Sequence, residues 1–292
     1  MSWRTVVISK RCKLDLRMGF LVLRNEEGTK RIHINEISLL IIENTAVSIT
    51  GCLLCELAAQ KIKVIFCDNK RNPCSELVNY YGSHDSSRKI ENQIKWDEYV
   101  KKHVWSEIVA EKIRKQSQFL KDIKKFHESL LLDEYVKQVE FADATNREGH
   151  AAKVYFNAVF GTDFTRTADN SINAGLNYGY SIILATFNRE IVASGYLTQL
   201  GIFHNNMFNH FNLSSDLMEP FRILIDRIVF YNEFNIFESA QKQLLLGVLN
   251  QKVLIDGKEQ LVSNAIRIYC KSIFDAIETH DISLIKFYNH EL

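Results

Sequence analysis

The hydrophobic pattern of this chain changes near residue 86, and this change limits the folds that the sequence can adopt. Before it, β-branched and other apolar residues occur in short runs between turn residues, which predicts strands. After it, apolar residues recur every three or four positions, which predicts helices that the 12 Gly and 2 Pro seldom interrupt. The sequence therefore predicts an α+β protein, with a small N-terminal β-sheet or sandwich domain over residues 1–82 and a larger all-helical domain over residues 83–292.

The N-terminal part is expected to form a mostly antiparallel sheet or sandwich, because its short apolar runs alternate with turns. A helix is expected over residues 51–61, followed by a buried strand over 64–67 and a loop over 68–73. Residues 80–87, which hold Gly, Ser and Asp, are expected to link the two domains. The other expected strands cover residues 3–9, 13–17, 20–23, 31–34 and 39–42.

In the second part, the most regular apolar stripe covers residues 172–191 and predicts one long helix. Asp169 or Ser171 is expected to cap this helix, and Gly195 to end it. Further helices are expected near 220–231, 238–252 and 260–288. A rougher stripe begins the helical part, and its members are Ile94, Tyr99, Val104, Ile108, Ile113 and Leu120.

The overall charge gives no argument for nucleic-acid binding, because 36 Lys and Arg are almost balanced by 35 Asp and Glu. The charge is nevertheless uneven along the chain. Residues 1–75 and 86–126 each carry a net charge of +5, and residues 127–169 carry −4. Solvated surface faces explain this distribution, and so does a protein whose basic surfaces bind phosphates while an acidic segment supplies metal ligands.

The sequence predicts a cytoplasmic protein with no membrane segment. The first residues lack the layout of a secretory signal, and no apolar run reaches the ~18 residues that a membrane span needs. Six Cys residues are scattered without a disulfide framework and are expected to be reduced. Cys52 and Cys55 form a CxxC, but no second ligand pair follows at zinc spacing, so they are expected to be buried small hydrophobic residues.

Three short segments hold the candidate functional residues, and each has an ordinary structural interpretation. Residues 146–156 include Glu148, which could form a capping box with Thr145 at a helix start. His204, in Gly-Ile-Phe-His, could be a satisfied loop histidine. Asp216 and Glu219, in Asp-Leu-Met-Glu-Pro-Phe-Arg, could favour the dipole at another helix start, where Pro is tolerated.

Taken together, the three segments indicate a different chemistry. Two carboxylates and one imidazole form a mixed oxygen and nitrogen shell for a divalent cation. Carboxylates suit Mg²⁺ or Mn²⁺, and the imidazole favours tolerance of Mn²⁺. Such an ion would polarise a phosphodiester and stabilise the charge on its attacking and leaving oxygens. Spacing alone does not prove that the segments meet.

In this order, the segments resemble those of the CRISPR-associated integrase of spacer acquisition, family one of the CRISPR-associated proteins, in its type II form. The resemblance covers essentially the whole chain, and the motifs are specific as a set. It implies that Glu148, His204 and Glu219 bind the metal and that Asp216 supports them in catalysis. Many relatives carry aspartate where this chain has Glu219, whose extra methylene leaves the oxygen chemistry intact.

The resemblance implies a metal-dependent DNA integrase with endonuclease activity. The 3′ hydroxyl of a captured DNA would attack a phosphodiester at the CRISPR repeat, in one transesterification for each strand. Basic side chains in the motifs and the run Lys112-x-Arg114-Lys115 would bind phosphates, and Tyr178 or Tyr180 would lie near the DNA unless both belong to the core. The implied DNA-binding residues are Arg147, Lys153, Tyr178, Tyr180 and Arg222.

The resemblance also implies partners. These are double-stranded DNA, a second copy of the chain bound through the N-terminal β domain, and a small ferredoxin-like CRISPR-associated protein. In type II systems an effector nuclease and a ring-forming accessory protein also take part. Two alternatives remain open: a plain metal-dependent nuclease, and a non-catalytic DNA-binding scaffold in which the acidic residues only cap helices.

Overall fold

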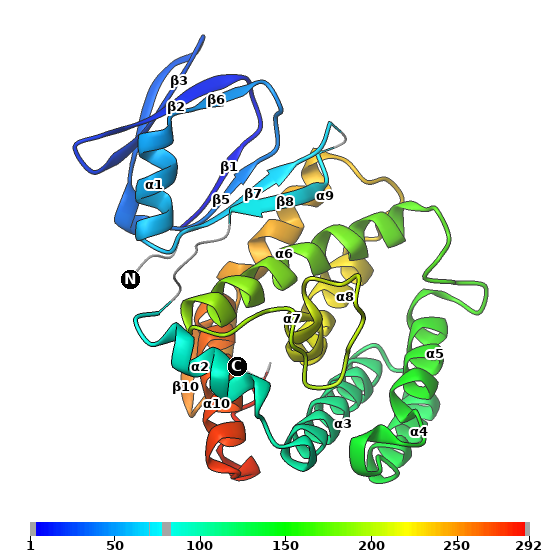
Figure 1. The fold of residues 1–292 in the computed structure, drawn as a ribbon. Coiled ribbons are helices and arrows are strands. Elements are labelled where there is room, and N and C mark those ends of the chain that lie inside the picture. Colours follow the sequence, from blue (N-terminus) through cyan, green and yellow to red (C-terminus); the bar gives the residue numbers. More distant parts are fainter. Residues whose placement is uncertain (1–3, 70, 78–82, 290–292) are drawn as a thin grey trace. The chain divides into compact units, whose positions relative to one another are not determined.

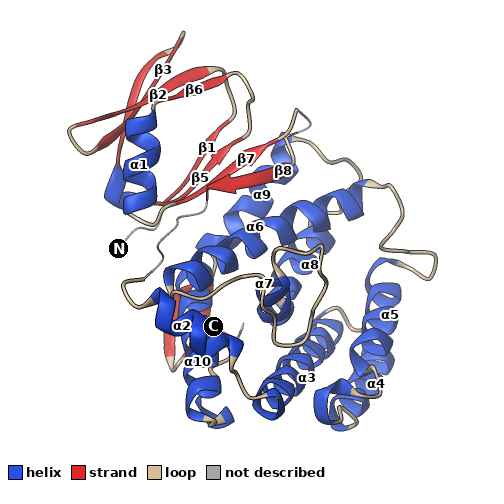
Figure 2. Ribbon diagram, in the orientation of Figure 1, coloured by secondary structure: helices blue, strands red, loops and turns tan. Residues whose placement is uncertain are grey.

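The structure is a computed structural model, and it describes residues 4–69, 71–77 and 83–289. The chain divides into two compact units, Met1–Ser86 with Val192–Tyr196, and Ser87–Ile191 with Leu197–Leu292 (Figure 1). The first unit is rich in strands and the second in helices, so the predicted α+β class is confirmed (Figure 2). The predicted boundary after residue 82 and the linker residues 80–82 fall outside the described residues.

Two four-stranded sheets form the N-terminal unit, with the strand orders β1-β5-β7-β8 and β4-β3-β2-β6. A single cluster of buried residues from both sheets makes its core, together with the buried face of helix α1 (Gly51–Ala59). The strands are β1 (Arg4–Ile8), β2 (Cys12–Arg17), β3 (Phe20–Asn25), β4 (Gly28–His33), β5 (Ile37–Ile42), β6 (Val47–Ile49), β7 (Lys63–Cys67) and β8 (Pro73–Leu77).

The prediction of a mostly antiparallel sheet holds for only three of the six strand pairings described in this unit, β2–β3, β3–β4 and β7–β8. Strand β5 pairs in parallel with both β1 and β7, and β2 pairs in parallel with β6. Every residue of β5 is buried, as expected for a strand in a parallel arrangement that is covered on both faces. The continuous apolar run at residues 39–42 was the signal for this arrangement.

Helix α1 packs on the sheets through Leu53 and Leu57, which are fully buried, and the hydroxyl of Thr50 caps its first turn. Because these two leucines define the buried face, Cys52 and Cys55 lie exposed. The prediction that both cysteines are buried small hydrophobic residues is therefore wrong.

The second unit is built mainly from helices. The long helix α3 (Glu98–Asp122) is capped by Asp97, and it packs against α4, α5 and α10. The other helices are α2 (Ser86–Ile94), α4 (Phe126–Lys137), α5 (Arg147–Phe160), α6 (Ser171–Ala193), α7 (Asn212–Leu217), α8 (Arg222–Tyr231), α9 (Ser239–Leu246) and α10 (Val262–Thr279). Short 3₁₀ helices are η1 (Ile34–Glu36) in the first unit and η2 (Phe141–Asp143), η3 (Glu219–Phe221), η4 (Gly247–Asn250) and η5 (Ile282–Leu284) in the second.

A two-stranded hairpin corrects the prediction of an all-helical second domain. Strands β9 (Lys252–Ile255) and β10 (Lys258–Leu261) pair in antiparallel fashion around the dipeptide Asp256-Gly257. Both turn residues have positive φ, 54° and 69°, as a two-residue hairpin turn of type I′ requires. The hairpin ends the predicted helix 238–252 early and delays the predicted helix 260–288.

The apolar stripes are confirmed where they lie inside a helix. Val104 and Ile108 of α3 are fully buried. Ile94 and Tyr99 are 69% and 64% exposed, because the helix is interrupted between α2 and α3 and the stripe does not continue across the interruption. Helix α6 ends before Gly195, as predicted. Its first turn is capped by Asn170, whose side chain accepts the N–H of Asn173, and not by Asp169 or Ser171.

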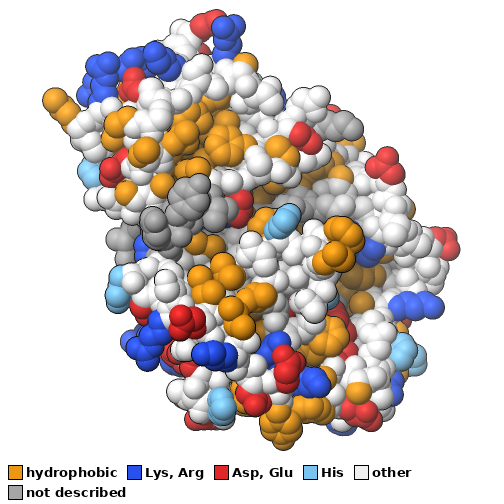
Figure 3. Space-filling view, viewed as in Figure 1, with side chains coloured by type: hydrophobic (Ala, Val, Ile, Leu, Met, Phe, Trp, Pro, Cys, Tyr) orange, Lys and Arg blue, Asp and Glu red, His pale blue; other side chains and the backbone are white. Residues whose placement is uncertain are grey.

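The surface shows no single charged face on the side drawn in Figure 3. Lys and Arg side chains gather at the end of the N-terminal unit where β3 lies, whereas both signs are interspersed over the helical unit. Within the described part of the chain, no helix combines the length and the apolar character that a bilayer crossing requires.

Candidate active site

The candidate residues lie on four elements of the helical unit. Glu148 is in the first turn of α5, His204 is in the loop before α7, Asp216 is in α7, and Glu219 begins η3. The middle of α3 contacts all three of α5, α7 and η3. The fold therefore collects the three sequence segments around one side of α3.

Glu148 is positioned by an unusual helix start. The carboxylate of Asp143 accepts the N–H groups of Arg147 (2.7 Å) and Glu148 (3.0 Å), and Asn146, at φ 52°, accepts the N–H of Gly149. A Cβ on Gly149 would lie 2.8 Å from Oδ1 of Asn146, so a side chain here would displace the capping amide. Since Asp143 and Asn146 cap the helix, the predicted capping box of Thr145 and Glu148 is wrong, and the Glu148 side chain points elsewhere.

His204 is held by Asp216, which is completely buried. The Asp216 carboxylate accepts the backbone N–H groups of Ile202 (2.7 Å), Phe203 (3.0 Å) and His204 (3.1 Å), and its Oδ1 lies 2.5 Å from Nδ1 of His204. A Cβ on Gly201 would lie 2.3 Å from the carbonyl oxygen of His204 and 2.8 Å from the carboxylate, so only glycine fits. The Gly-x-x-His motif is thus a loop folded around one carboxylate.

The same loop is fixed to α3 by aromatic contacts. The ring of Phe203 stacks on buried Trp105 with a centroid distance of 4.5 Å and an interplanar angle of 3°. His204 meets Trp105 edge-on at 5.6 Å. The hydrogen bond to Asp216 raises the pKa of His204 against the opposing effect of burial, and the negative charges of Glu219 and Glu148 add to the increase.

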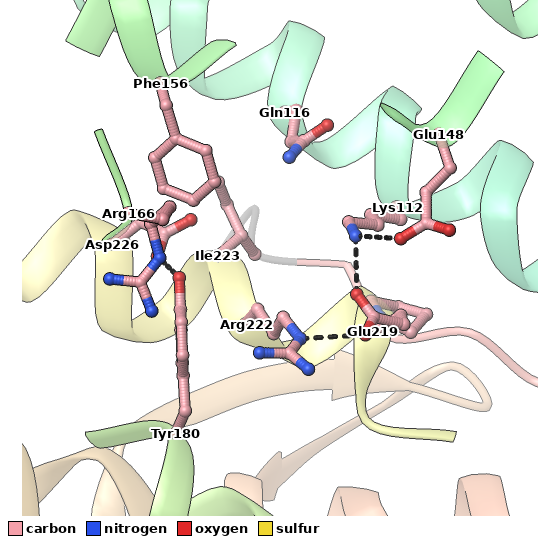
Figure 4. Close-up of a pocket in the computed structure, with 11 residues that line it drawn as sticks. Lys112, Gln116, Glu148, Phe156, Arg166, Tyr180, Glu219, Arg222, Ile223 and Asp226 are labelled. Carbon is pink, nitrogen blue, oxygen red and sulfur yellow. Dashed lines mark hydrogen bonds and ion pairs between the residues drawn. The ribbon is translucent and has the colours of Figure 1, made fainter. Parts of the chain in front are cut away.

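Glu148 and Glu219 meet at the ammonium of Lys112. Its Nζ lies 2.6 Å from Oε1 of Glu148 and 2.6 Å from Oε2 of Glu219 (Figure 4). Glu219 is 5% exposed, and its other oxygen accepts Nε–H of Arg222 at 2.9 Å. The structure therefore brings the two carboxylates together and pairs His204 with Asp216.

The charges at this position stabilise one another. Burial disfavours the charged form of Glu219, but the positive charges of Arg222 and Lys112 outweigh it and lower the pKa of Glu219 to about 2. Burial likewise opposes the charge of Lys112, and the carboxylates of Glu219 and Glu148 nevertheless raise the pKa of Lys112. Glu219 and Lys112 are therefore both charged at neutral pH.

A pocket opens beside these ion pairs. Arg166 and Arg222 lie over the ring of Tyr180, at 5.4 and 4.8 Å from its centroid. The hydroxyls of Tyr155 (3.0 Å) and Tyr180 donate to the buried carboxylate of Asp226, whose pKa burial raises to about 6. The pocket is lined by Lys112, Gln116, Glu148, Phe156, Arg166, Tyr180, Glu219, Pro220, Arg222, Ile223 and Asp226 (Figure 4).

The residues expected to contact DNA have different surroundings. Lys153 is exposed on α5, and Arg147 lies 5.5 Å from the ring centroid of Tyr135. Tyr178 is 3% exposed and packs edge-on against Phe237, so it belongs to the core, the alternative left open by the sequence. Tyr180 lines the pocket.

Two of the three residues of the basic run of α3, Lys112 and Lys115, are turned inward, and Arg114 is 48% exposed. Lys112 contacts Glu148 and Glu219, while Lys115 and Arg114 both pair with Glu111 at 3.1 Å. Lys112 and Lys115 are only 12% and 11% exposed. The expectation that this run offers its charges to DNA phosphates is wrong for these two buried lysines.

The roles of Lys112 and Asp226 in the pocket were not predicted from the sequence. Lys112 stands four residues after Ile108 and eight after Val104, on the buried face of α3, and a charged residue in that register was its signal. Asp226 stands four residues after Arg222 on the inner face of α8. Within the described residues, no group of three or more His, Cys, Asp and Glu side chains is arranged as a ready metal site.

Comparisons with known proteins agree with the motifs. The sequence model of the family described as "CRISPR associated protein Cas1" matches residues 5–243. The CRISPR-associated endonuclease Cas1 of Neisseria meningitidis serogroup C is 33% identical over 231 residues, which cover 79% of this chain and 76% of that protein. A Cas1 endonuclease of Francisella tularensis subsp. novicida is 24% identical over 87% of this chain and 89% of its own length.

Solved structures show the same fold. A Cas1 protein from Thermotoga maritima matches with a TM-score of 0.76 at 17% identity, over 94% of this chain and 97% of that one. A casposase bound to its integration product matches with a TM-score of 0.76 at 17% identity, over 96% and 91%. Because the family model matches most of its length and a relative is 33% identical, the chain belongs to the Cas1 family of CRISPR-associated proteins.

Proposed function

We propose that this chain is a metal-dependent DNA integrase of CRISPR adaptation, of the type II form, that also cleaves DNA. It joins the 3′ hydroxyl ends of captured spacer DNA to the CRISPR repeat by transesterification. The observation that carries the proposal is the convergence of Glu148 and Glu219 on one buried cation. Family membership and the fold shared with a casposase bound to its integration product support it.

The two carboxylates and the imidazole are donor types that suit a divalent ion. The carboxylates of Glu148 and Glu219 already hold a positive charge between them, with the Lys112 ammonium standing in for the ion. His204 presents Nδ1 to Asp216, so its Nε2 is the nitrogen that can act as a ligand. Glu148, Glu219 and His204 would hold Mg²⁺ or Mn²⁺, and Asp216 would orient the imidazole. When bound, the ion supplies polarisation of the scissile phosphate.

The reaction needs no protein nucleophile. The 3′ oxygen of the captured DNA forms a bond to the target phosphorus, the bond from that phosphorus to the neighbouring 3′ oxygen breaks, and one hydroxyl proton is transferred to the released oxygen. The guanidinium of Arg222, which faces the pocket, would neutralise the phosphate during this exchange. Arg147, Lys153 and Tyr180 would bind the DNA strands next to the pocket.

The partners follow from the two-ended substrate. Joining both strands requires two active sites at a fixed separation, so a homodimer formed through the N-terminal β unit is proposed. The similar fold in structures named as Cas6-RT-Cas1–Cas2 complexes favours assembly with a small ferredoxin-like partner. A type II effector nuclease and a ring-forming accessory protein complete the proposed set.

Strand joining on a repeat-containing supercoiled plasmid tests the proposal. The protein is incubated with a short duplex that carries 3′ hydroxyls, with Mn²⁺ or with chelator. Joined product that requires the metal and the 3′ hydroxyl is expected. Fragments without joined product would instead indicate a plain nuclease, because water would then be the attacking group.

The His204→Ala variant separates catalysis from a scaffold role. It is expected to lose joining and to retain DNA binding, since the side chain is a proposed ligand and not a phosphate contact. His210→Ala, at an exposed histidine of the same loop, is the matched control and keeps its activity. Joining by His204→Ala at the wild-type rate would rule out the proposed metal site.

A further inference from the structure

The ammonium of Lys112 is held by carboxylates from two distant parts of the chain. Lys112 belongs to the middle of α3, Glu148 to the first turn of α5, and Glu219 to η3. The two N–O distances are both 2.6 Å, and the Lys112 side chain is only 12% exposed (Figure 4). Lys112 therefore belongs to the interior of the site and is not a surface lysine that forms a solvent-exposed ion pair.

The charges around Lys112 already balance. Two carboxylates, Glu148 and Glu219, face two cations, Lys112 and Arg222. Adding two more positive charges here is unfavourable unless a cation leaves, because an uncompensated buried charge is costly. Of the two cations, Lys112 is the one that contacts both acids.

The ammonium and a divalent ion also compete for space. Mg²⁺ binds carboxylate oxygens at about 2.1 Å, and the Lys112 nitrogen lies 2.6 Å from one oxygen of each acid. An ion that uses these two oxygens would overlap Nζ or repel it at short range. Metal binding by both acids therefore requires Lys112 to move.

We propose that Lys112 is a displaceable counter-ion, which occupies the cation position of the site until a divalent ion replaces it. The inference rests on the proposed metal site. It assigns to Lys112 a role in setting metal affinity: the protein binds the ion more weakly than its ligands alone would, because the ammonium is displaced first. The two carboxylates remain compensated in the absence of metal.

Mn²⁺ binding to the purified full-length protein, followed by the loss of the free-ion EPR signal, tests the inference without DNA and without an activity assay. Lys112→Met removes the charge and keeps the length of the side chain. It is expected to bind Mn²⁺ at least about tenfold more tightly than the wild type, a change within the usual range for one bound group opposing another. Lys112→Arg keeps the charge and is expected to bind as weakly as the wild type.

Lys115→Met is the matched control. Lys115 is a second buried lysine of α3, one turn further on, but it pairs with Glu111 and with the carbonyl of Tyr288. Its replacement is expected to leave Mn²⁺ affinity unchanged. A gain in Lys115→Met equal to that in Lys112→Met would overturn the inference, because a general loss of positive charge would then explain both.

A Glu219→Gln substitution separates the two proposals. Glu219→Gln is made both in the wild type and in Lys112→Met. If Lys112→Met binds Mn²⁺ no more tightly than the wild type, and Glu219→Gln abolishes binding in both proteins, the metal site stands and the counter-ion role is wrong. If Glu219→Gln leaves Mn²⁺ binding intact in both proteins, or if neither the wild type nor Lys112→Met binds Mn²⁺, the metal site itself is wrong.

A second measurement does not depend on the folding of a variant. Crystals of the wild-type protein with Mn²⁺ are expected to show Nζ of Lys112 moved out of contact with Glu148 and Glu219. An ion bound to both acids with Nζ still within 4.0 Å of each, the limit of an ion pair, would contradict the inference.

Discussion

Asp216 holds the imidazole of His204 through a contact of 2.5 Å between Oδ1 and Nδ1, and it also accepts the backbone N–H of the same residue at 3.1 Å. One carboxylate therefore fixes both the ring and the chain that carries it. Asp216 is completely buried, whereas the His204 side chain is 42% exposed, so the carboxylate end of this pair is shielded from solvent and the imidazole is not.

Replacing Asp216 by Asn should lower the pKa of His204, since the hydrogen bond to the charged carboxylate is the largest cause of its increase. Stability should also fall by about 1–3 kcal/mol, because the amide offers one acceptor oxygen to the loop N–H groups in place of two. NMR titration of the imidazole without metal measures the first effect, and urea unfolding the second. An unchanged pKa would show that the 2.5 Å contact does not persist in solution.

Gly201→Ala should destabilise the loop around Asp216. The new Cβ would lie 2.3 Å from the backbone oxygen of His204, so the loop must shift, at a cost of about 1–3 kcal/mol. Strand joining should fall together with the melting temperature. Gly247→Ala is the control, because nothing lies within 4 Å of its Cβ position and its φ of −62° suits alanine. Equal melting temperatures for both variants would contradict the packing argument.

Asp226 predicts a pH dependence of stability. Its pKa is about 6 in the folded protein against 3.8 as the ordinary value, so the folded state binds the proton more tightly. The resulting stabilisation is fully present below pH 3.8 and is lost as the pH rises through 6. Relative to Asp226→Asn, the wild type should therefore lose about 2–3 kcal/mol between about pH 4 and about pH 7. Parallel unfolding free energies across this range would disprove the shift.

Tyr180→Phe tests the hydroxyl that donates to Asp226. Its removal takes away one of two donors to a buried carboxylate, so stability at neutral pH should fall by about 1–3 kcal/mol. The pKa of Asp226 should rise further, because the hydrogen bonds of both tyrosines lower it. The pH range over which stability is lost should therefore move to higher pH, and Tyr155→Phe should act in the same direction.

Lys153→Gln tests a phosphate contact on exposed α5. DNA affinity should fall for all sequences alike, and the slope of log affinity against log salt should decrease by about 0.9. Lys137→Gln, at a surface lysine paired with Glu134, is the control and should leave the slope unchanged. Equal slopes for wild type and Lys153→Gln would remove this residue from the DNA interface.

The sequence by itself was sufficient for the fold class and for selecting the three segments that the fold brings together around α3. Periodicity reports which side of an element is buried, so the change near residue 86 predicted strands before helices. The spacing around His204 and Gly201, and the position of Pro220 at a helix start, are local features whose causes lie within a few residues. The family resemblance rested on the same local motifs, and the family match confirms it.

Tertiary structure decided which groups face one another. Parallel pairing of β5, the pairing of His204 with Asp216, and the position of Lys112 between Glu148 and Glu219 all join residues far apart in the chain. No local pattern encodes such pairings, because a charged residue on the buried face of a helix has the same sequence signal whatever partner it meets. The packing of α3 against α5 and η3 determines which residues face Lys112. Because an unpaired buried charge is costly, Lys112 needs a negatively charged partner at this position.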